Sequence, residues 1–253
     1  MSDEKKNIIL RTEDLKRSYK MVSQTGEKIV QNVLKGITFE VEQGEFVAIM
    51  GRSGGGKTTL LKTLGLMDKP NGGKVYYKET DSKNIYGRKL AGIRRRELSF
   101  VFQDFYLMDS LTVRENMMLP LILDEADTKE SIATVERLAK RFSISHLLGK
   151  KPYELSGGEK QRVALCRTLS ADPDLILADE PTGNLDTESS EVVIQAFSEI
   201  NEEFGKTILL VTHDPIIASY CKRIIFLKDG QIVEDLARQE DRETFYQEIL
   251  KRM

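Results

Sequence analysis

The residues best suited to chemistry are concentrated in a glycine-rich segment near position 51. The stretch Gly51-Arg52-Ser53-Gly54-Gly55-Gly56-Lys57-Thr58 fits the pattern G-x-x-x-x-G-K-[ST]. The apolar run at 46–50 precedes it and a helix-forming run at 59–64 follows it. Glycines let backbone N–H groups wrap a phosphate without Cβ clashes, and a helix start adds favourable partial charge. The segment therefore predicts a nucleotide phosphate site, with a ligand-free flexible glycine loop as the competing interpretation.

Two side chains of this loop have distinct expected roles. Lys57 would bridge the β- and γ-phosphates, and the Thr58 hydroxyl would ligate Mg²⁺. The other expected nucleotide contacts of this segment are Gly51, Arg52, Ser53, Gly54, Gly55, Gly56 and Thr59.

A pair of carboxylates follows another apolar run. Asp179 and Glu180 come directly after the run at 175–178. Asp179 is expected in the Mg²⁺ shell, and Glu180 is expected to polarise the attacking water. An Asp-Glu pair can also simply start a loop, but beside a phosphate loop the catalytic interpretation is favoured.

Two further polar side chains follow apolar runs. His213 comes after the run at 207–211, and Gln103 after the run at 98–102. His213 is expected to hydrogen-bond the γ-phosphate or its attacking water. Gln103 is expected to reach the metal or the water through its amide oxygen. His146, the other histidine, is interpreted as structural.

A second helix start with phosphate-binding character lies far along the chain from the first. In Leu155–Arg162, the residues Ser156, Gly157 and Gly158 precede a helical run at 159–169. The hydroxyl and the backbone N–H groups would point at a phosphate. If both segments bind the same kind of phosphate, each is expected to complete a site on another copy of the chain. An ordinary capped helix is the alternative.

The elements that position these residues alternate between strand and helix patterns. The short apolar runs at 46–50, 98–102, 175–178 and 207–211 predict buried strands of a mostly parallel sheet covered on both faces. Residues 8–50 alternate in the strand manner, and Asp229-Gly230 predicts a two-residue hairpin. The segment 103–155 reads as an inserted helical subdomain.

Helix-period stripes are expected to face the core. They comprise Ile132, Val135, Leu138, Ala139 and Phe142, and then Val192, Val193, Ala196, Phe197 and Ile200. The tail carries Phe245, Ile249 and Met253 at four-residue spacing, which predicts a last helix packed on its own chain or on a partner.

Composition limits the possible functions. The 253 residues carry a net charge of −2 and two cysteines, Cys166 and Cys221, so neither a basic nucleic-acid field nor a disulfide framework is indicated. Residues 1–6 show no secretory signal, and no apolar run approaches a membrane span. The expected location is the cytoplasm, with any membrane role peripheral.

Together these motifs resemble the ATP-binding cassette (ABC) ATPases. The matching elements, in the family's order, are Gly51–Thr58 (Walker A), Gln103 (Q-loop), Leu155–Arg162 (signature), Ala178–Glu180 (Walker B), Gly183–Asp186 (D-loop) and His213 (H-loop). The resemblance implies a head-to-tail dimer that sandwiches two ATP molecules, with Asp186 among the nucleotide contacts. Tyr19 matches the aromatic position that stacks on adenine; a simple strand-edge tyrosine is the alternative.

The resemblance also implies a fold. It is an α/β P-loop NTPase (RecA-like) core with a mostly parallel sheet, an N-terminal antiparallel β subdomain and an inserted α-helical subdomain. Residues 1–253 would form one nucleotide-binding domain. Its expected parts are a core at 1–102 and 156–235, the helical subdomain at 103–155 and a C-terminal helix at 236–253.

Within the family, the chain looks like the macrolide-export, lipoprotein-release and antimicrobial-peptide-resistance branch, and is most similar to the bacitracin-resistance type. The expected function is the ATPase subunit of a bacterial transporter, docked on the inner face of a separate membrane permease that handles antimicrobial peptides, lipids or lipoproteins. Docking is expected near Gln103 and the 104–154 segment. Candidate contacts are Arg114, Met117, Met118 and Leu119, unless these form subdomain core and solvated face.

Two other functions use the same cassette. One is an ATPase that signals through a membrane partner without transport. The other is a DNA-associated or ribosome-associated ATPase, which the short 103–155 insertion and the single cassette disfavour. The basic run Arg94–Arg96 is interpreted as a solvated helix face, so no nucleic-acid partner is expected.

Overall fold

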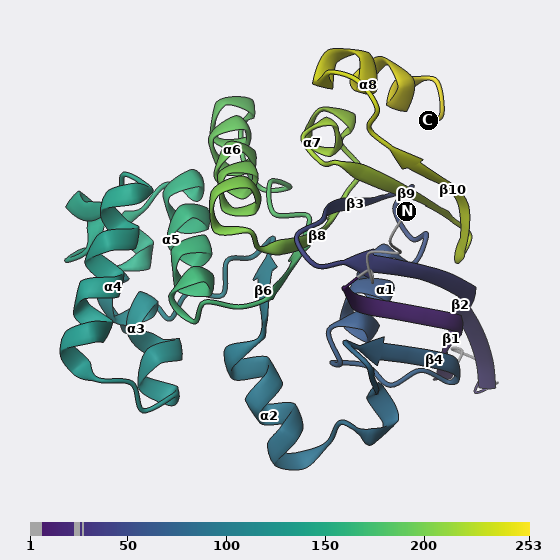
Figure 1. The fold of residues 1–253 in the computed structure, drawn as a ribbon, viewed down its shortest axis with the longest axis horizontal. Helices are drawn as coiled ribbons and strands as arrows, with labels where there is room; N and C mark the ends of the chain where they lie inside the picture. Colours follow the sequence, from purple (N-terminus) through teal and green to yellow (C-terminus); the bar gives the residue numbers. More distant parts are fainter. Residues whose placement is uncertain (1–6, 23–25, 27) are drawn as a thin grey trace, which may run out of the picture. The chain divides into compact units, whose positions relative to one another are not determined.

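A computed structural model describes residues 7–22, 26 and 28–253 (Figure 1). The chain forms two units. The first contains the described residues up to Gly87 together with Leu209–Met253, and the second is Arg88–Ile208. Residues 1–6, on which the expected absence of a secretory signal depends, lie outside the described residues.

The amino-terminal part of the first unit is an antiparallel sheet. Its strands, in the order β2-β1-β4-β5, are β2 (Lys28–Glu42), β1 (Ile8–Val22), β4 (Gly72–Tyr77) and β5 (Thr80–Asp81). In β2 the side chains of Leu34, Ile37, Phe39 and Val41 are buried while the residues between them are more exposed, as expected for a sheet with one covered face. The predicted antiparallel β subdomain is confirmed.

The strand that precedes the predicted phosphate loop belongs to a second set of strands. Their order is β10-β9-β3-β8, with bounds Gln231–Ala237, Arg223–Lys228, Phe46–Met50 and Thr207–Thr212, and all but the first two residues of β8 belong to the first unit. Strand β3 pairs with β9 in parallel, and β9 pairs with β10 in the antiparallel sense. Asp229 and Gly230 have φ values of 50° and 80° between β9 and β10, which confirms the predicted hairpin turn.

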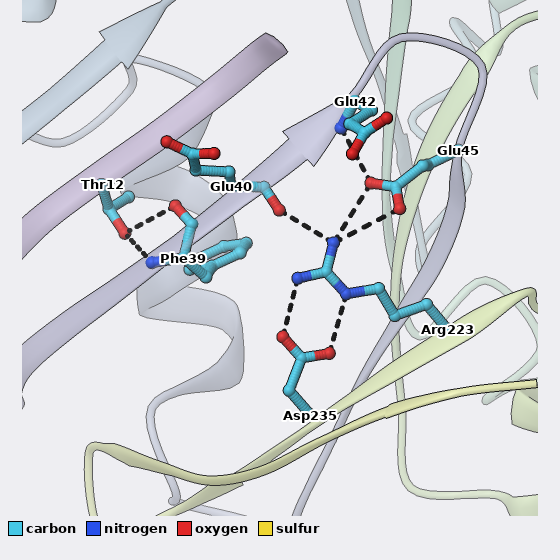
Figure 2. A network of polar contacts seen from close by, with 7 residues as sticks. All are labelled: Thr12, Phe39, Glu40, Glu42, Glu45, Arg223 and Asp235. Carbon is cyan, nitrogen blue, oxygen red and sulfur yellow. Dashed lines mark hydrogen bonds and ion pairs between the residues drawn. The ribbon is translucent and has the colours of Figure 1, made fainter. Parts of the chain in front are cut away.

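An arginine joins the two sheets of this unit (Figure 2). Arg223 of β9 donates from Nε and Nη2 to the two carboxylate oxygens of Asp235 on β10, both at 2.7 Å. Its Nη1 donates to the Glu40 carbonyl of β2 at 2.9 Å and contacts the Glu45 carboxylate at 3.2 Å. These hydrogen bonds raise the pKa of Arg223. The guanidinium therefore fixes β2 against the β9–β10 hairpin.

The α-helices that lie wholly within the described part of the first unit are α1 (Lys57–Leu64), α7 (Pro215–Ser219) and α8 (Arg242–Leu250), and a short 3-10 helix spans Ser82–Asn84. Helix α8 lies beside α7 (Figure 1), and the Arg242 guanidinium lies 4.2 Å from the centroid of the Tyr220 ring. Phe245 and Ile249 are buried, so these two tail residues pack on their own chain, whereas Met253 is exposed.

The second unit is mainly helical around two parallel strands. Strands β6 (Leu98–Phe102) and β7 (Leu175–Asp179) pair in register, with Phe102 opposite Asp179. The helices are α2 (Gly87–Arg96), of which only the first residue belongs to the first unit, α3 (Val113–Leu123), α4 (Thr128–Arg141), α5 (Gly157–Ser170) and α6 (Thr187–Phe204). Helices α3 and α4, which belong to the predicted inserted helical subdomain, pack with α5 (Figure 1).

The predicted helical stripes are buried except at one position each. Ile132 of α4 and Val192 of α6 are 36 % and 40 % exposed. In α4 the buried residue one helical turn before Val135 is Ser131. Each residue turns the helix surface by about 100°, so Ile132 lies off the core-facing stripe. Cys166 and Cys221 are buried, and burial raises the pKa of both thiols.

Candidate nucleotide site

The predicted phosphate loop connects a fully buried strand to a helix. All residues of β3 are buried, and α1 begins at Lys57. Gly54 and Gly56 have φ values of 78° and 97°, a conformation that favours glycine. Gly56 is the N-cap of α1 and has no side chain with which to cap the helix. A helix start of this kind fits a phosphate group.

Lys57 holds the loop closed. Its Nζ donates to the carbonyl oxygens of Gly51 at 2.9 Å and Arg52 at 3.1 Å, and the residue is 5 % exposed. The ammonium group is therefore positioned within the concave side of its own loop. Arg52, Ser53, Gly54 and Thr58 are exposed, and Thr59 is half-buried.

Close packing explains two of the loop glycines. A Cβ on Gly51 would lie 2.1 Å from the Leu227 carbonyl oxygen of β9. A Cβ on Gly56 would lie 3.2 Å from side-chain atoms of Val33 and Leu34 on β2. The loop thus packs against both sheets of the first unit, and these contacts fix its backbone conformation.

Tyr19 and His213 are the other predicted site residues of this unit. His213 is exposed and follows β8, the strand beside β3, which precedes the phosphate loop. Tyr19 is half-buried on β1, and its ring is contacted by the Arg17 guanidinium.

In the second unit, parallel pairing brings the Q-loop and Walker B residues to one sheet edge. Gln103 follows Phe102 and Glu180 follows Asp179, and these two strand ends are register partners. Asp179 and Glu180 are half-buried at the end of a buried strand. Glu180 has a φ of 44°, which is unfavourable for a side chain with a Cβ.

Asn184 ties the Q-loop to the D-loop. Gln103 Nε2 donates to Asn184 Oδ1 at 2.8 Å, and Asn184 Nδ2 donates back to the Gln103 carbonyl at 3.2 Å. These two bonds use the side-chain nitrogen and the main-chain carbonyl oxygen of Gln103. They do not use its side-chain amide oxygen, which is the atom that the predicted metal contact needs. Asn184 was identified within a motif from the sequence, but nothing there indicated this contact.

The signature residues form the start of α5. Ser156 is the N-cap: its Oγ accepts from the Glu159 N–H at 3.3 Å, and Glu159 Oε2 accepts from the Ser156 N–H at 2.8 Å. This capping box lowers the pKa of Glu159. The structure thus contains the capped helix of the alternative interpretation, and the two interpretations are compatible because backbone N–H groups of the first turn remain at the helix end.

The signature glycines also have a packing role that sequence reasoning missed. A Cβ on Gly157 would lie 3.0 Å from Leu185 Cδ2, and one on Gly158 would lie 2.9 Å from Ser189 Oγ. Asp186 caps α6 and accepts from the Ser189 N–H at 2.8 Å, which lowers its pKa. The D-loop therefore contacts both the Q-loop and the signature within one unit.

The predicted metal donors are a hydroxyl, an amide oxygen and a carboxylate, from Thr58, Gln103 and Asp179. Across the described ranges, no cluster of three His, Cys, Asp or Glu side chains forms a cage for a metal. Mg²⁺ is usually bound by one or two carboxylates together with nucleotide phosphates and water and needs no such cage, so a set of one carboxylate and two neutral oxygens fits it.

A phosphate loop after a buried strand, with an Asp-Glu pair after another, defines a P-loop NTPase. The sequence profile of the family described as ABC transporter matches residues 34–183. The chain belongs to this family, and it is an ABC transporter ATP-binding subunit and ATPase.

Individual relatives agree with this assignment. An uncharacterised ABC transporter ATP-binding protein of Bacillus subtilis, YvcR, is 47 % identical over 242 residues, which are 96 % of this chain and 92 % of the relative. The bacitracin export ATP-binding protein BceA of Halalkalibacterium halodurans is 43 % identical over 87 % of this chain and 88 % of its own. A macrolide export ATP-binding/permease protein, of which the match covers 34 %, and a lipoprotein-releasing system ATP-binding protein are also similar, which confirms the predicted branch.

A solved structure confirms the fold. The dimeric, post-hydrolysis structure of the ATP-binding cassette MJ0796 of Methanocaldococcus jannaschii, bound to ADP and phosphate, has a TM-score of 0.82 and 36 % identity. The match covers 91 % of this chain and 99 % of that one. In the part of this chain that the structure describes, no helix has the length and apolar character that a membrane span needs.

Proposed function

We propose that this chain is a peripheral subunit on the inner face of the cell membrane, which powers a separate permease for antimicrobial peptides, lipids or lipoproteins. Similarity to a bacitracin export ATP-binding protein over 87 % of the chain is the observation that carries the substrate class. The permease would select the transported molecule, since the candidate site residues of this chain are assigned to nucleotide and Mg²⁺.

In the proposed ATP cycle, each residue has a defined task. Lys57 binds the β- and γ-phosphates, and Thr58, Gln103 and Asp179 hold Mg²⁺. The ion, when bound, neutralises charge on the phosphate oxygens. Glu180 accepts the proton of the attacking water, and His213 hydrogen-bonds the γ-phosphate. The strained φ of 44° at Glu180 supports its role, because backbone strain of this kind is concentrated at functional sites.

The proposed working unit is a head-to-tail homodimer. Each nucleotide would be held by Gly51–Thr58 of one chain and by Ser156, Gly157 and Gly158 of the other, with Asp186 near the shared interface. The dimeric state of the similar cassette MJ0796 supports this arrangement. The parts proposed for the domain are the core at 1–102 and 156–235, the helical subdomain at 103–155 and the C-terminal helix at 236–253.

A mixing experiment tests the composite site. A Lys57→Ala homodimer and a Ser156→Arg homodimer would each have one defect in both sites. The mixed dimer would have one site with both defects and one intact site. We therefore expect ATPase activity and ATP-dependent dimers, measured by light scattering, to return on mixing. Mixtures without dimers would refute the composite site.

The permease is proposed to dock near Gln103 and the 104–154 segment. Among the candidate contacts, Met117 is fully buried and is therefore assigned to the packing of the segment. Met118 and Leu119 are half-buried, and Arg114 pairs with Glu136 at 3.0 Å. The exposed side chains of Tyr106 and Met108, close after Gln103, extend the candidate surface.

The competing proposal is ATP-driven signalling through the permease without transport. Reconstitution of this chain with the permease encoded beside its gene distinguishes the two. ATP-dependent movement of a labelled peptide antibiotic across the vesicle membrane would support transport. ATP hydrolysis that responds to the peptide without moving it would support signalling.

A further inference from the structure

The Tyr19 ring is fixed on two sides. The Arg17 guanidinium carbon lies 4.4 Å from the ring centroid, and the Tyr19 hydroxyl donates to Asp68 Oδ2. The other oxygen of the same carboxylate lies 3.7 Å from Arg17 Nη2. Asp68 therefore contacts both the ring's hydroxyl and the cation that covers one ring face.

Strand β2 connects these contacts to the phosphate loop. Arg17 of β1 is opposite Leu34 of β2. Side-chain atoms of Leu34 and of its neighbour Val33 would lie 3.2 Å from a Cβ on Gly56, directly before α1. The part of β2 beside Arg17 therefore also packs against the phosphate loop.

The same contacts reach the other end of the phosphate-loop helix. Asp68 follows α1, and its N–H donates to the Lys62 carbonyl at 3.2 Å. Helix α1 is therefore joined to β2 at its start, where Gly56 packs against Val33 and Leu34, and to Tyr19 of β1 near its end, through Asp68.

Arg17 is itself held in position. Its Nη1 donates to Asn71 Oδ1 at 3.3 Å, and the same oxygen accepts from the Ser18 N–H at 2.6 Å. The Arg17 side chain is only 18 % exposed, and its buried Nε has no hydrogen-bond partner among the described residues. The Arg17 guanidinium lies over the Tyr19 ring although one of its donors is unsatisfied there. Its position is therefore set by the ring, Asp68 and Asn71 together, and not by satisfying all of its hydrogen-bond donors.

We propose that Arg17 and Asp68 are positioning residues that present one face of Tyr19 to the adenine of bound ATP. Arg17 covers the opposite ring face, and Asp68 fixes the hydroxyl, so the ring loses little freedom when the base stacks on it. The inference rests on the proposed role of Tyr19 and Gly51–Thr58 in nucleotide binding, and it adds the residues that set adenine affinity.

The test compares ATP with inorganic tripolyphosphate, which has the phosphates without the base. Calorimetry on Arg17→Met and Asp68→Ala should show ATP affinity reduced about 3- to 10-fold, the range that one newly mobile side chain produces. Affinity for tripolyphosphate should not change. In turnover assays KM for ATP should rise and kcat should stay. The matched control is Lys16→Met, a cation of the same strand paired with exposed Asp14 at 2.7 Å, which should leave both affinities intact.

A double variant separates positioning from general support of the fold. In a Tyr19→Ala background, Asp68→Ala should cause no further loss of ATP affinity, because the ring it positions is gone. Equal losses for ATP and tripolyphosphate, additive effects with Tyr19→Ala, or unchanged ATP affinity in both single variants would each overturn the proposal. A wild-type chain that binds neither compound would instead remove the nucleotide site itself, and the proposal with it.

Discussion

Arg167 Nη2 of helix α5 donates a 2.9 Å hydrogen bond to the carbonyl oxygen of Phe105, in the segment that follows Gln103. Its Nη1 donates to the Tyr106 carbonyl. Phe105 and Tyr106 have φ values of 62° and 45°, so two consecutive aromatic residues occupy a conformation that disfavours side chains. The signature helix therefore stabilises the strained turn of the Q-loop.

Arg167→Met is expected to release this turn. Removing the guanidinium takes the charged donor from two carbonyls, which should lower the free energy of unfolding by about 2 kcal/mol. Amide hydrogen exchange should accelerate at 104–107. Arg137→Met, at an exposed position of α4, is the control for loss of a helical arginine and should change neither quantity. Unchanged exchange at 104–107 would show that the turn does not depend on Arg167.

Two replacements of Ser156 should separate helix capping from phosphate binding. Ser156→Asp keeps an N-cap acceptor, so its stability should match wild type, while Ser156→Ala should lose about 1 kcal/mol. In the proposed dimer, however, the new carboxylate of Ser156→Asp would face the γ-phosphate, and the two negative charges would repel each other. ATP-dependent dimerisation should therefore fall in the order wild type, Ser156→Ala, Ser156→Asp. Denaturation ranks the variants by stability, and light scattering ranks them by ATP-dependent dimerisation. If the two rankings agree, Ser156 serves only as a helix cap.

Gly51→Ala should destabilise the protein because the new Cβ would lie 2.1 Å from the Leu227 carbonyl oxygen. The loop or β9 must move, at a cost of about 1–3 kcal/mol, and ATP affinity should fall with it. Gly92→Ala is the control, and it should change stability in the opposite direction. A Cβ there meets no atom within 4 Å, and alanine in a helix should add about 0.5–1 kcal/mol. Denaturant titration of both variants tests the contrast; equal shifts would contradict the packing argument.

The sequence predicted the strands well because buried parallel strands are continuous apolar runs. The run at 46–50 became β3 and the run at 98–102 became β6 with identical bounds. Motif spacing likewise points to the candidate site residues, because phosphate chemistry restricts which residue types are possible at Gly51–Thr58, and their roles stay a prediction.

The contacts that support the site were not predictable in the same way. The bond from Tyr19 to Asp68 and the packing of Gly158 on Ser189 join residues that belong to no common pattern. Ile132 was misplaced because the stripe was read from apolar residues alone, whereas the buried neighbour is the polar Ser131. Such positions depend on tertiary packing, which a single periodicity does not contain.

Glu180→Gln should keep ATP binding and lose turnover. Glutamine has a similar shape but cannot accept the proton of the attacking water, so kcat should fall at least about 100-fold. The ATP-bound dimer should then accumulate in light scattering. Glu188→Gln, an exposed position in the first turn of α6, should hydrolyse ATP normally. Undiminished hydrolysis by Glu180→Gln would remove Glu180 from the role of base.

Acid should weaken the start of the signature helix through Glu159. The Ser156 N–H donates to this carboxylate and lowers its pKa, so the folded state binds the proton less well than the unfolded state. The resulting stability is fully present above the unfolded value of about 4.3 and is lost as pH falls through the lower folded pKa.

Glu159→Gln should therefore be less stable than wild type at neutral pH, because an uncharged amide makes a weaker bond to the Ser156 N–H. The difference should shrink as pH falls below about 4, where wild type is protonated as well. Urea titrations from pH 7 to pH 3 measure it. Glu130→Gln, in the first turn of α4, controls for loss of an exposed helical carboxylate. A difference that stays constant with pH would mean that the charge of Glu159 does not stabilise the helix on which the composite site depends.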